Sequence, residues 1–126
     1  MAMNGKLIGF APITDADRAK AFYADVLGLT FVADDGFALI FRSGANMVRL
    51  AKMPQVIPAQ FTILGWETNS IEDDVQSLTA KGVEFVRFGF MEQDALGIWT
   101  APDGDKVAWF KDPDGNTLSL SQHIAA

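Results

Sequence analysis

Hydrophobic and polar positions follow one pattern that occurs twice along this chain. Each half opens with a short apolar run, at residues 6–13 and 61–67, and continues with a stretch of helical periodicity. Further short runs then recur between turn residues, and such runs are typical of β-strands. In the first half they are 29–33, 37–42 and 46–52, and in the second half 83–88, 105–111 and 117–122, with 97–101 expected to be extended.

The two stretches of helical periodicity each bury one face. The first is expected from about Asp15 to Leu27, with Thr14 as the N-cap and Gly28 at its end. Its apolar residues recur at i, i+3, i+4, i+7 and i+8, and they are Ala19, Phe22, Tyr23, Val26 and Leu27. The second begins after Ser70 and ends at Gly82, with its buried stripe at Ile71, Val75 and Leu78.

A turn near the end of the chain is the sharpest local signal. Asp112-Pro113-Asp114-Gly115-Asn116 lies between two apolar runs, so it predicts strand, tight turn, strand. A weaker copy spans residues 41–50, where Asn46 corresponds to Asn116. The internal repeat constrains the fold more than either turn alone.

These elements predict an α+β fold made of two βαβββ modules. The repeats are residues 6–52 and 61–122, and the Pro54- and Pro58-containing segment 53–60 links them within a single domain, 1–126. We expect the mixed sheets to form an incomplete barrel with the helices outside. Its concave inner face is then the natural place for a ligand.

Composition and charge narrow the classes of function. The net charge is −6 and no Lys/Arg cluster occurs, so we expect no nucleic-acid partner. An acidic surface serves solubility and would also suit a cationic ligand. No apolar run reaches membrane-spanning length, and residues 1–6 are too short and polar for a signal peptide, so we expect a cytoplasmic protein without a membrane partner.

The order of these motifs resembles the vicinal oxygen chelate superfamily, which includes glyoxalase I, extradiol dioxygenases and bleomycin-resistance proteins. The resemblance covers residues about 6 to 122. It is carried by Asp15 through Phe22-Tyr23 to Leu27-Gly28-Leu29, by Ile71, Leu78 and Lys81-Gly82-Val83, and by 110–116. It implies paired βαβββ modules and a homodimer.

The metal enzymes of this superfamily place ligands on the strands that open and close each module. By the resemblance, these positions fall at Ile8, Arg49, Ile63 and Ser119. None is a carboxylate or an imidazole, so we expect no metal and no cofactor. A carboxylate-only site at Glu67 is the alternative, and the one histidine, His123, is expected in a loose, solvent-exposed tail. No nucleophile-plus-base pair is visible.

Side chains alternate between the two faces of a strand, so the neighbours of these four positions are also expected to face inward. They are Phe10, Met47, Gly65, Glu67, Thr117 and Ser121. The predicted ligand contacts are Phe10, Met47, Arg49, Glu67, Trp99 and Ser119.

Arg49 is a candidate clamp for a carboxylate or phosphate, with an ion pair to Glu67 as the alternative. The loop 89–96 is a candidate cover for the pocket mouth.

Three functions fit this sequence. The first is a metal-free protein that binds a small, partly apolar molecule in the barrel groove. The second is a lyase, isomerase or dioxygenase with a non-standard site, in which Glu67 acts as acid or base and Arg49 stabilises an oxyanion. The third is a structural or regulatory dimer without a ligand.

Overall fold

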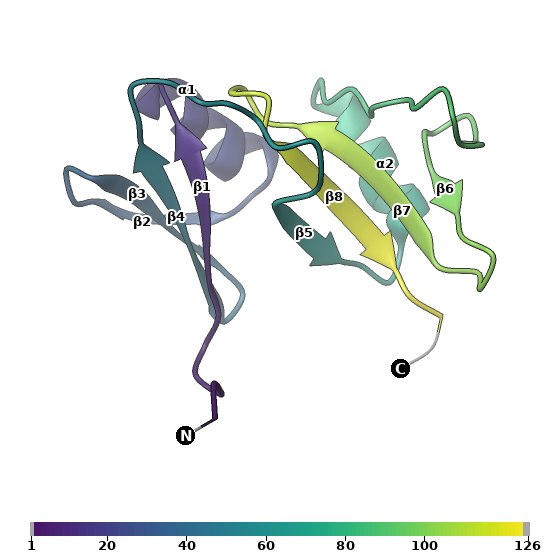
Figure 1. The fold of residues 1–126 in the computed structure, drawn as a ribbon, viewed down its shortest axis with the longest axis horizontal. Coiled ribbons are helices and arrows are strands. Elements are labelled where there is room, and N and C mark those ends of the chain that lie inside the picture. Colours follow the sequence, from purple (N-terminus) through teal and green to yellow (C-terminus); the bar gives the residue numbers. More distant parts are fainter. Residues whose placement is uncertain (1, 125–126) are drawn as a thin grey trace. The chain divides into compact units, whose positions relative to one another are not determined.

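Each half of the chain builds its own four-stranded mixed sheet with helix on one face (Figure 1). The computed structural model describes residues 2–124. The chain forms two compact units, and the boundary between them lies between Ile57 and Pro58. The predicted α+β class and the repeated βαβββ order are confirmed. None of the helices within residues 2–124 is long and apolar enough to cross a membrane.

The first unit consists of β1 (Ile8–Ile13), α1 (Ala16–Lys20), η1 (Ala21–Val26), β2 (Thr30–Asp34), β3 (Ala38–Ser43) and β4 (Asn46–Lys52). Its strand order is β1-β4-β3-β2. The opening strand β1 runs parallel to the closing strand β4, while β2, β3 and β4 form an antiparallel meander. The parallel pair is possible because the helix and the hairpin lie between its two strands in sequence.

The first helix covers nearly the predicted range but differs at both ends. Its N-cap is Asp15 rather than Thr14, and the Asp15 carboxylate accepts a hydrogen bond from the backbone N–H of Arg18 at 3.1 Å. In η1 the backbone spacing widens, with the N–H of Leu27 donating to the carbonyl of Phe22 at 3.0 Å. Apolar periodicity does not distinguish this wider π-type turn from an ordinary α-turn.

Strand alternation separates the two faces of the first sheet. One face packs under the helix, where Tyr23 and Phe41 are fully buried with ring centroids 6.0 Å apart. Ala11, Ile13, Leu39, Val48 and Leu50 complete this core. The alternate residues of the same strands lie on the open face, which carries the candidate ligand contacts.

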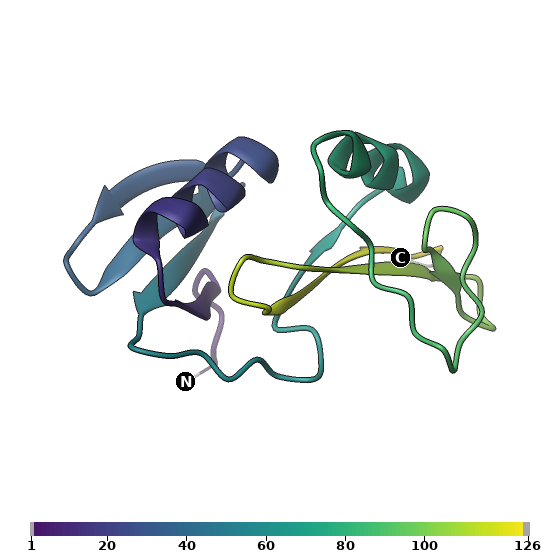
Figure 2. The same cartoon turned by 90° about the horizontal axis from the view of Figure 1, so that it is seen from above.

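The second unit consists of β5 (Leu64–Glu67), α2 (Ile71–Ala80), β6 (Trp99–Thr100), β7 (Lys106–Lys111) and β8 (Thr117–Gln122). Its strand order, β5-β8-β7-β6, repeats the topology of the first unit, again with a parallel pair of opening and closing strands. The core under α2 contains Ile71, Val75, Ala108, Phe110 and Leu118. Figure 2 shows α2 along one face of this sheet.

The predicted strand at 83–88 is wrong. Only a single bridge joins Phe85 to Phe110 there. Gln93 explains the difference, since its side-chain amide accepts from the N–H of Phe88 at 2.7 Å and donates to the carbonyls of Val86 and Gly97, each at 2.9 Å. The Gln93 side chain thus bonds the N–H of Phe88 and the carbonyl of Val86, while the N–H of Val86 donates to the carbonyl of Trp109 on β7 at 2.8 Å.

The turn at 112–116 is built around one buried carboxylate. Asp112 is 4% exposed. Its Oδ1 accepts from the backbone N–H groups of Asp114 and Asn116, both at 2.9 Å, and its Oδ2 accepts from Nδ2 of Asn116 at 2.8 Å. Gly115 has a φ of 85°, which favours glycine. This network fixes where β8 begins, and β8 carries two of the hydroxyl groups of the second open face.

Candidate functional site

The open face of the first sheet groups three of the predicted ligand contacts. The register aligns Ile8 with Met47 and Phe10 with Arg49 on β1 and β4. Phe10 is 60% exposed, Ile8 44% and Met47 36%. Exposed apolar side chains on one sheet face form a surface that can accept an apolar ligand.

A hollow of about 420 Å³ lies at one end of this face. Its size falls within the range of small-molecule sites, about 300–1,000 Å³. The β3–β4 turn forms one wall. The residues that line it are Lys6, Ile8, Val32, Ile40, Phe41, Arg42, Gly44, Ala45, Asn46 and Met47. Sequence reasoning placed Ile8 and Met47 on this face but missed Lys6, Val32, Ile40 and Arg42. The alternation that placed Met47 on β4 would have found Ile40 and Arg42 on β3.

Arg49 forms an ion pair, but not with Glu67, the partner that the sequence analysis named. Its guanidinium pairs with Asp35, in the loop between β2 and β3, and not with Glu67. The same Asp35 carboxylate accepts from the backbone N–H groups of Phe37 at 2.9 Å and Ala38 at 2.8 Å. These two N–H groups, followed by Arg49, hold the pKa of Asp35 below its ordinary value. Arg49 therefore braces the hairpin of its own unit.

The open face of the second sheet holds the remaining predicted contacts. The register aligns Gly65 with Ser119 and Glu67 with Ser121 on β5 and β8. Ser119 is only 7% exposed, and its hydroxyl lies against Gly65, where an added Cβ would come within 2.9 Å of Oγ. Ser119 is thus the least exposed of the predicted contacts on this face.

Aromatic rings occupy the other side of this second face. Trp99 on β6 lies next to Trp109 on β7, with ring centroids 6.2 Å apart. Phe88 packs edge-on against Trp109 at 5.3 Å and also contacts Phe90. The predicted contact Trp99 is therefore part of an aromatic surface, of the kind that favours stacking with planar ligands.

Hydrogen bonds connect the loop 89–96 to its own flanking residues. Besides the Gln93 amide, the guanidinium of Arg87 donates to the carbonyls of Asp94 and Ala95, each at 2.7 Å. The Asp94 carboxylate accepts from the N–H groups of Leu96 and Ile98, each at 2.9 Å. These bonds join the loop to the residues that flank it on both sides, 86–88 and 97–98.

His123 is bound, contrary to the expectation of a loose tail. Its Nδ1 lies 2.7 Å from Oδ2 of Asp105, and its Nε2 lies 3.1 Å from Oγ of Ser121. The Asp105 hydrogen bond raises the pKa of His123, and the same contact, with the backbone N–H of Ile124, lowers that of Asp105. The structure thus contains a serine–histidine contact where none was expected. The last part of the predicted tail, residues 125–126, lies outside the described residues.

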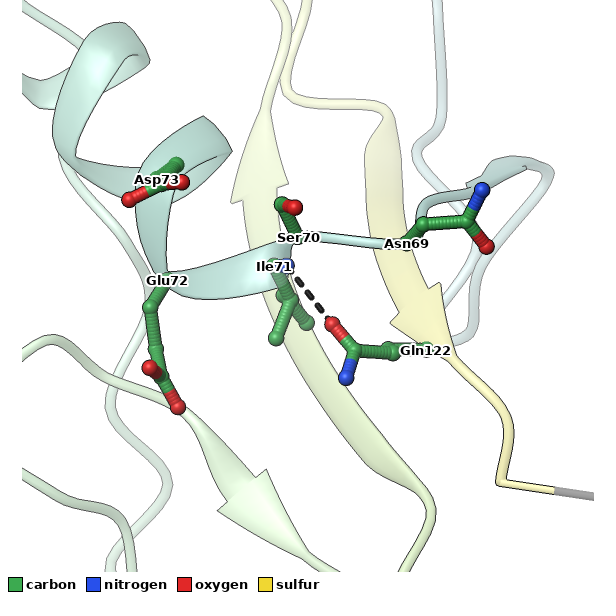
Figure 3. Close-up of a pocket in the computed structure, with 6 residues that line it drawn as sticks. All are labelled: Asn69, Ser70, Ile71, Glu72, Asp73 and Gln122. Atoms are coloured by element: carbon green, nitrogen blue, oxygen red, sulfur yellow. Dashed lines mark hydrogen bonds between the residues drawn. The ribbon is translucent and has the colours of Figure 1, made fainter.

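A smaller hollow of about 180 Å³ lies at the N-terminus of α2 (Figure 3). Ser70, the predicted cap, makes no side-chain capping bond. Instead, Oε1 of Gln122 on β8 accepts from the backbone N–H of Ile71 at 2.8 Å. Glu72 and Asp73 also line the hollow. A side chain of the protein thus accepts from the first N–H group of this helix, and the two carboxylates beside it disfavour an anion.

The four positions that the resemblance assigns to metal ligands do not hold suitable donor atoms. Of the four positions that the resemblance assigns to ligands, Ile8 and Ile63 have no donor atom, Arg49 is paired with Asp35 and Ser119 is a neutral hydroxyl. No group of three or more His, Cys, Asp or Glu among residues 2–124 is arranged to hold a metal ion. These side chains do not fit the metal site of the superfamily's enzymes.

Comparison with known proteins identifies the family. A model of the Glyoxalase/Bleomycin resistance protein/Dioxygenase superfamily matches residues 10–120. Among curated proteins, none matches the chain in sequence.

Solved structures share the fold over nearly the whole chain. The antibiotic-binding protein TnmS3 from Streptomyces sp. CB03234 is 25% identical with a TM-score of 0.73, over 97% of this chain and 98% of that one. A superfamily member from Sphaerobacter thermophilus DSM 20745 is 22% identical with a TM-score of 0.75, over 96% and 98%. A lactoylglutathione lyase from Agrobacterium tumefaciens is 18% identical with a TM-score of 0.74, over 96% and 95%. The chain therefore belongs to the Glyoxalase/Bleomycin resistance protein/Dioxygenase superfamily.

Proposed function

We propose that this protein is a metal-free binder of small, partly apolar molecules, and that the hollow on the first sheet is a ligand site. The observation that carries this proposal is the hollow itself. Ile8, Val32, Ile40 and Met47 give it an apolar lining, and the β3–β4 turn bounds it. Burial of an aromatic ring against such a surface contributes about 25 cal/mol for each Å² removed from water.

The other proposed ligand contacts lie on the same two open faces. On the first sheet they are Phe10, Met47 and Arg49, and on the second they are Glu67, Trp99 and Ser119. The similarity to an antibiotic-binding protein supports a binding role over a purely structural one. A cytoplasmic homodimer remains part of the proposal, and sedimentation velocity of the purified chain tests the dimer.

A fluorescence titration with N-phenyl-1-naphthylamine tests the ligand site. This neutral probe brightens when it enters an apolar site, and we expect saturable binding in the micromolar range, about −8 kcal/mol at 1 μM. Met47→Asp puts a charge in the floor of the hollow and should abolish the binding. Phe90→Asp is the matched control, because Phe90 is 83% exposed and lies in the second unit. Equal binding by the Met47 and Phe90 variants would refute this site.

Metal analysis tests the metal-free part of the proposal separately. Protein purified without chelator should contain no stoichiometric Ni, Zn, Mn or Fe. A metal ion that binds the folded protein raises the midpoint of thermal unfolding by mass action. Because we expect no metal to bind, addition of each metal should leave this midpoint unchanged. A stoichiometric metal, or a rise in that midpoint at micromolar metal, would contradict the proposal.

A second candidate function, ester hydrolysis with Ser121 as nucleophile and His123 as its base, is favoured by the contacts of His123. Asp105 orients the imidazole, and Nε2 faces the Ser121 hydroxyl at 3.1 Å. With p-nitrophenyl acetate, Nε2 would take the hydroxyl proton while Oγ attacks the carbonyl and p-nitrophenolate leaves. Water then releases acetate from the acyl-serine. Hydrolysis above the buffer rate that is lost in both Ser121→Ala and His123→Gln would support this candidate, and hydrolysis unchanged in either would exclude it.

A further inference from the structure

The charges around the hollow are opposite to the charge of the chain. The sequence has sixteen acidic and ten basic residues, with a net charge of −6. None of the residues that line the hollow is acidic, while two of them, Lys6 and Arg42, are basic. A cation-lined hollow on an acidic protein is a local feature that overall charge does not explain.

Among residues 2–124, these two cations have no partner. Elsewhere in the first unit, basic side chains are engaged: Arg49 pairs with Asp35, and Lys52 pairs with Asp34 at 2.8 Å. By contrast, the ammonium group of Lys6 and the guanidinium of Arg42 make no hydrogen bond or ion pair with any other of residues 2–124. Both side chains are exposed to solvent. The N–H donors and the positive charges of these two side chains are therefore available to a ligand.

The strand register places the cations around an apolar floor. Arg42 on β3 is aligned with Met47 on β4, and Met47 is aligned with Ile8 on β1. Neighbouring strands are about 4.8 Å apart, so this row spans about 10 Å. Lys6 precedes Ile8 and lines the same hollow. A fused aromatic ring system of this length could lie on Met47 with an acidic group at its end.

We propose that the ligand of this hollow is an amphipathic anion, a claim that rests on the proposed function. Its ring system packs on Ile8, Ile40 and Met47, and its carboxylate, sulfonate or phosphate group is held by Arg42 and Lys6. Guanidinium groups bind such oxyanions through two parallel N–H donors, while an ammonium group adds a point charge. Contacts at exposed cations are screened by salt, so binding should weaken as ionic strength rises.

Two probes with one aromatic skeleton test the role of the charge. 8-Anilinonaphthalene-1-sulfonate carries an anionic group that N-phenyl-1-naphthylamine lacks. We expect Arg42→Gln and Lys6→Gln each to weaken sulfonate binding about three- to tenfold, and to change binding of the neutral probe less than about twofold. Raising NaCl should weaken binding of the sulfonate only.

The matched control is Lys20→Gln, which removes the same charge from the same unit. The Lys20 ammonium lies 4.0 Å from the ring of Phe31 and is not among the residues of the hollow. This variant should bind both probes like the unchanged protein. Arg42→Lys should keep part of the sulfonate affinity, because it keeps the charge but loses the paired donors. Thermal unfolding of each variant confirms that it is folded.

The possible results separate the two proposals. If both probes bind, and neither the Arg42 nor the Lys6 variant lowers sulfonate affinity more than Lys20→Gln does, the anion inference is wrong and the ligand site stands. If these variants weaken both probes equally, the cations act on the shape of the hollow and not on the anion, and the inference is again wrong. If neither probe binds, the proposed function and this inference both fall.

Discussion

The buried Asp112 carboxylate offers a quantitative test of what holds the second unit together. In Asp112→Ala, three N–H donors lose their acceptor: two backbone groups at 2.9 Å and the Asn116 side chain at 2.8 Å. Hydrogen bonds to a charged group contribute about 1.5–3 kcal/mol each, and their sum is less than additive because they share one carboxylate. We therefore expect Asp112→Ala to lower the free energy of unfolding by about 3–5 kcal/mol.

Urea denaturation followed by tryptophan fluorescence measures this loss. A typical domain has about 5–15 kcal/mol of stability, so the variant should unfold at clearly lower urea. Asp103→Ala is the matched control, because Asp103 makes one comparable bond, to the N–H of Asp105 at 3.0 Å, in an exposed turn. It should change stability by less than about 1 kcal/mol.

A second variant tests whether the pairing itself matters. Asp112→Asn places an amide against Nδ2 of Asn116, so two donors face each other. The reversed pair, Asp112→Asn with Asn116→Asp, restores one donor and one acceptor and should recover part of the loss. If Asp112→Ala proves no more costly than Asp103→Ala, burial and hydrogen bonding of this carboxylate are not what stabilises the turn.

Two further predictions concern the second unit. The pKa of His123 is raised above its ordinary value of 6.5, and the pKa of Asp105 is lowered below 3.8. The ion pair therefore stabilises the fold fully between pH 3.8 and pH 6.5. This stabilisation is lost as the pH rises through the folded-state pKa of His123. The stability difference between the unchanged protein and His123→Gln, measured by urea denaturation, should therefore be larger at about pH 5.5 than at about pH 8.5, and an equal difference at both would contradict the assignment. A Cβ at Gly65 would lie 2.9 Å from Oγ of Ser119, so Gly65→Ala should cost about 1–3 kcal/mol, and adding Ser119→Ala should relieve part of that cost. Failure of the second substitution to relieve the first would place the strain elsewhere.

Periodicity and turn chemistry predicted most of the fold because they are local. The helix after Asp15, the meander of the first unit and the turn at 112–116 each depend on residues close in sequence. The segment 83–88 has an apolar pattern, yet it makes only one bridge to β7, and the amide of Gln93 bonds its backbone at Val86 and Phe88. Three hydrogen bonds between one side-chain amide and the backbone leave no periodic signal in the sequence.

The site could be predicted only in part. Alternation correctly placed Phe10, Met47 and Arg49 on one face. It did not reveal that Arg49 is paired with Asp35, because that contact joins a strand to a hairpin loop. It also gave no sign of the contact between His123 and Asp105, which are 18 residues apart and meet at the ends of two neighbouring strands. Contacts of this kind depend on the tertiary structure.

The alternation of faces in the first sheet also bears on how this protein could change during evolution. Leu39, Val48 and Leu50 pack under the helix and determine stability, whereas Ile40, Arg42 and Met47, next to them in sequence, face the hollow. Substitutions at the second set leave the packed core untouched, so ligand preference can drift with little cost in stability. A two-residue period along three strands thus lets one scaffold acquire new ligands while its fold is maintained by selection on other positions.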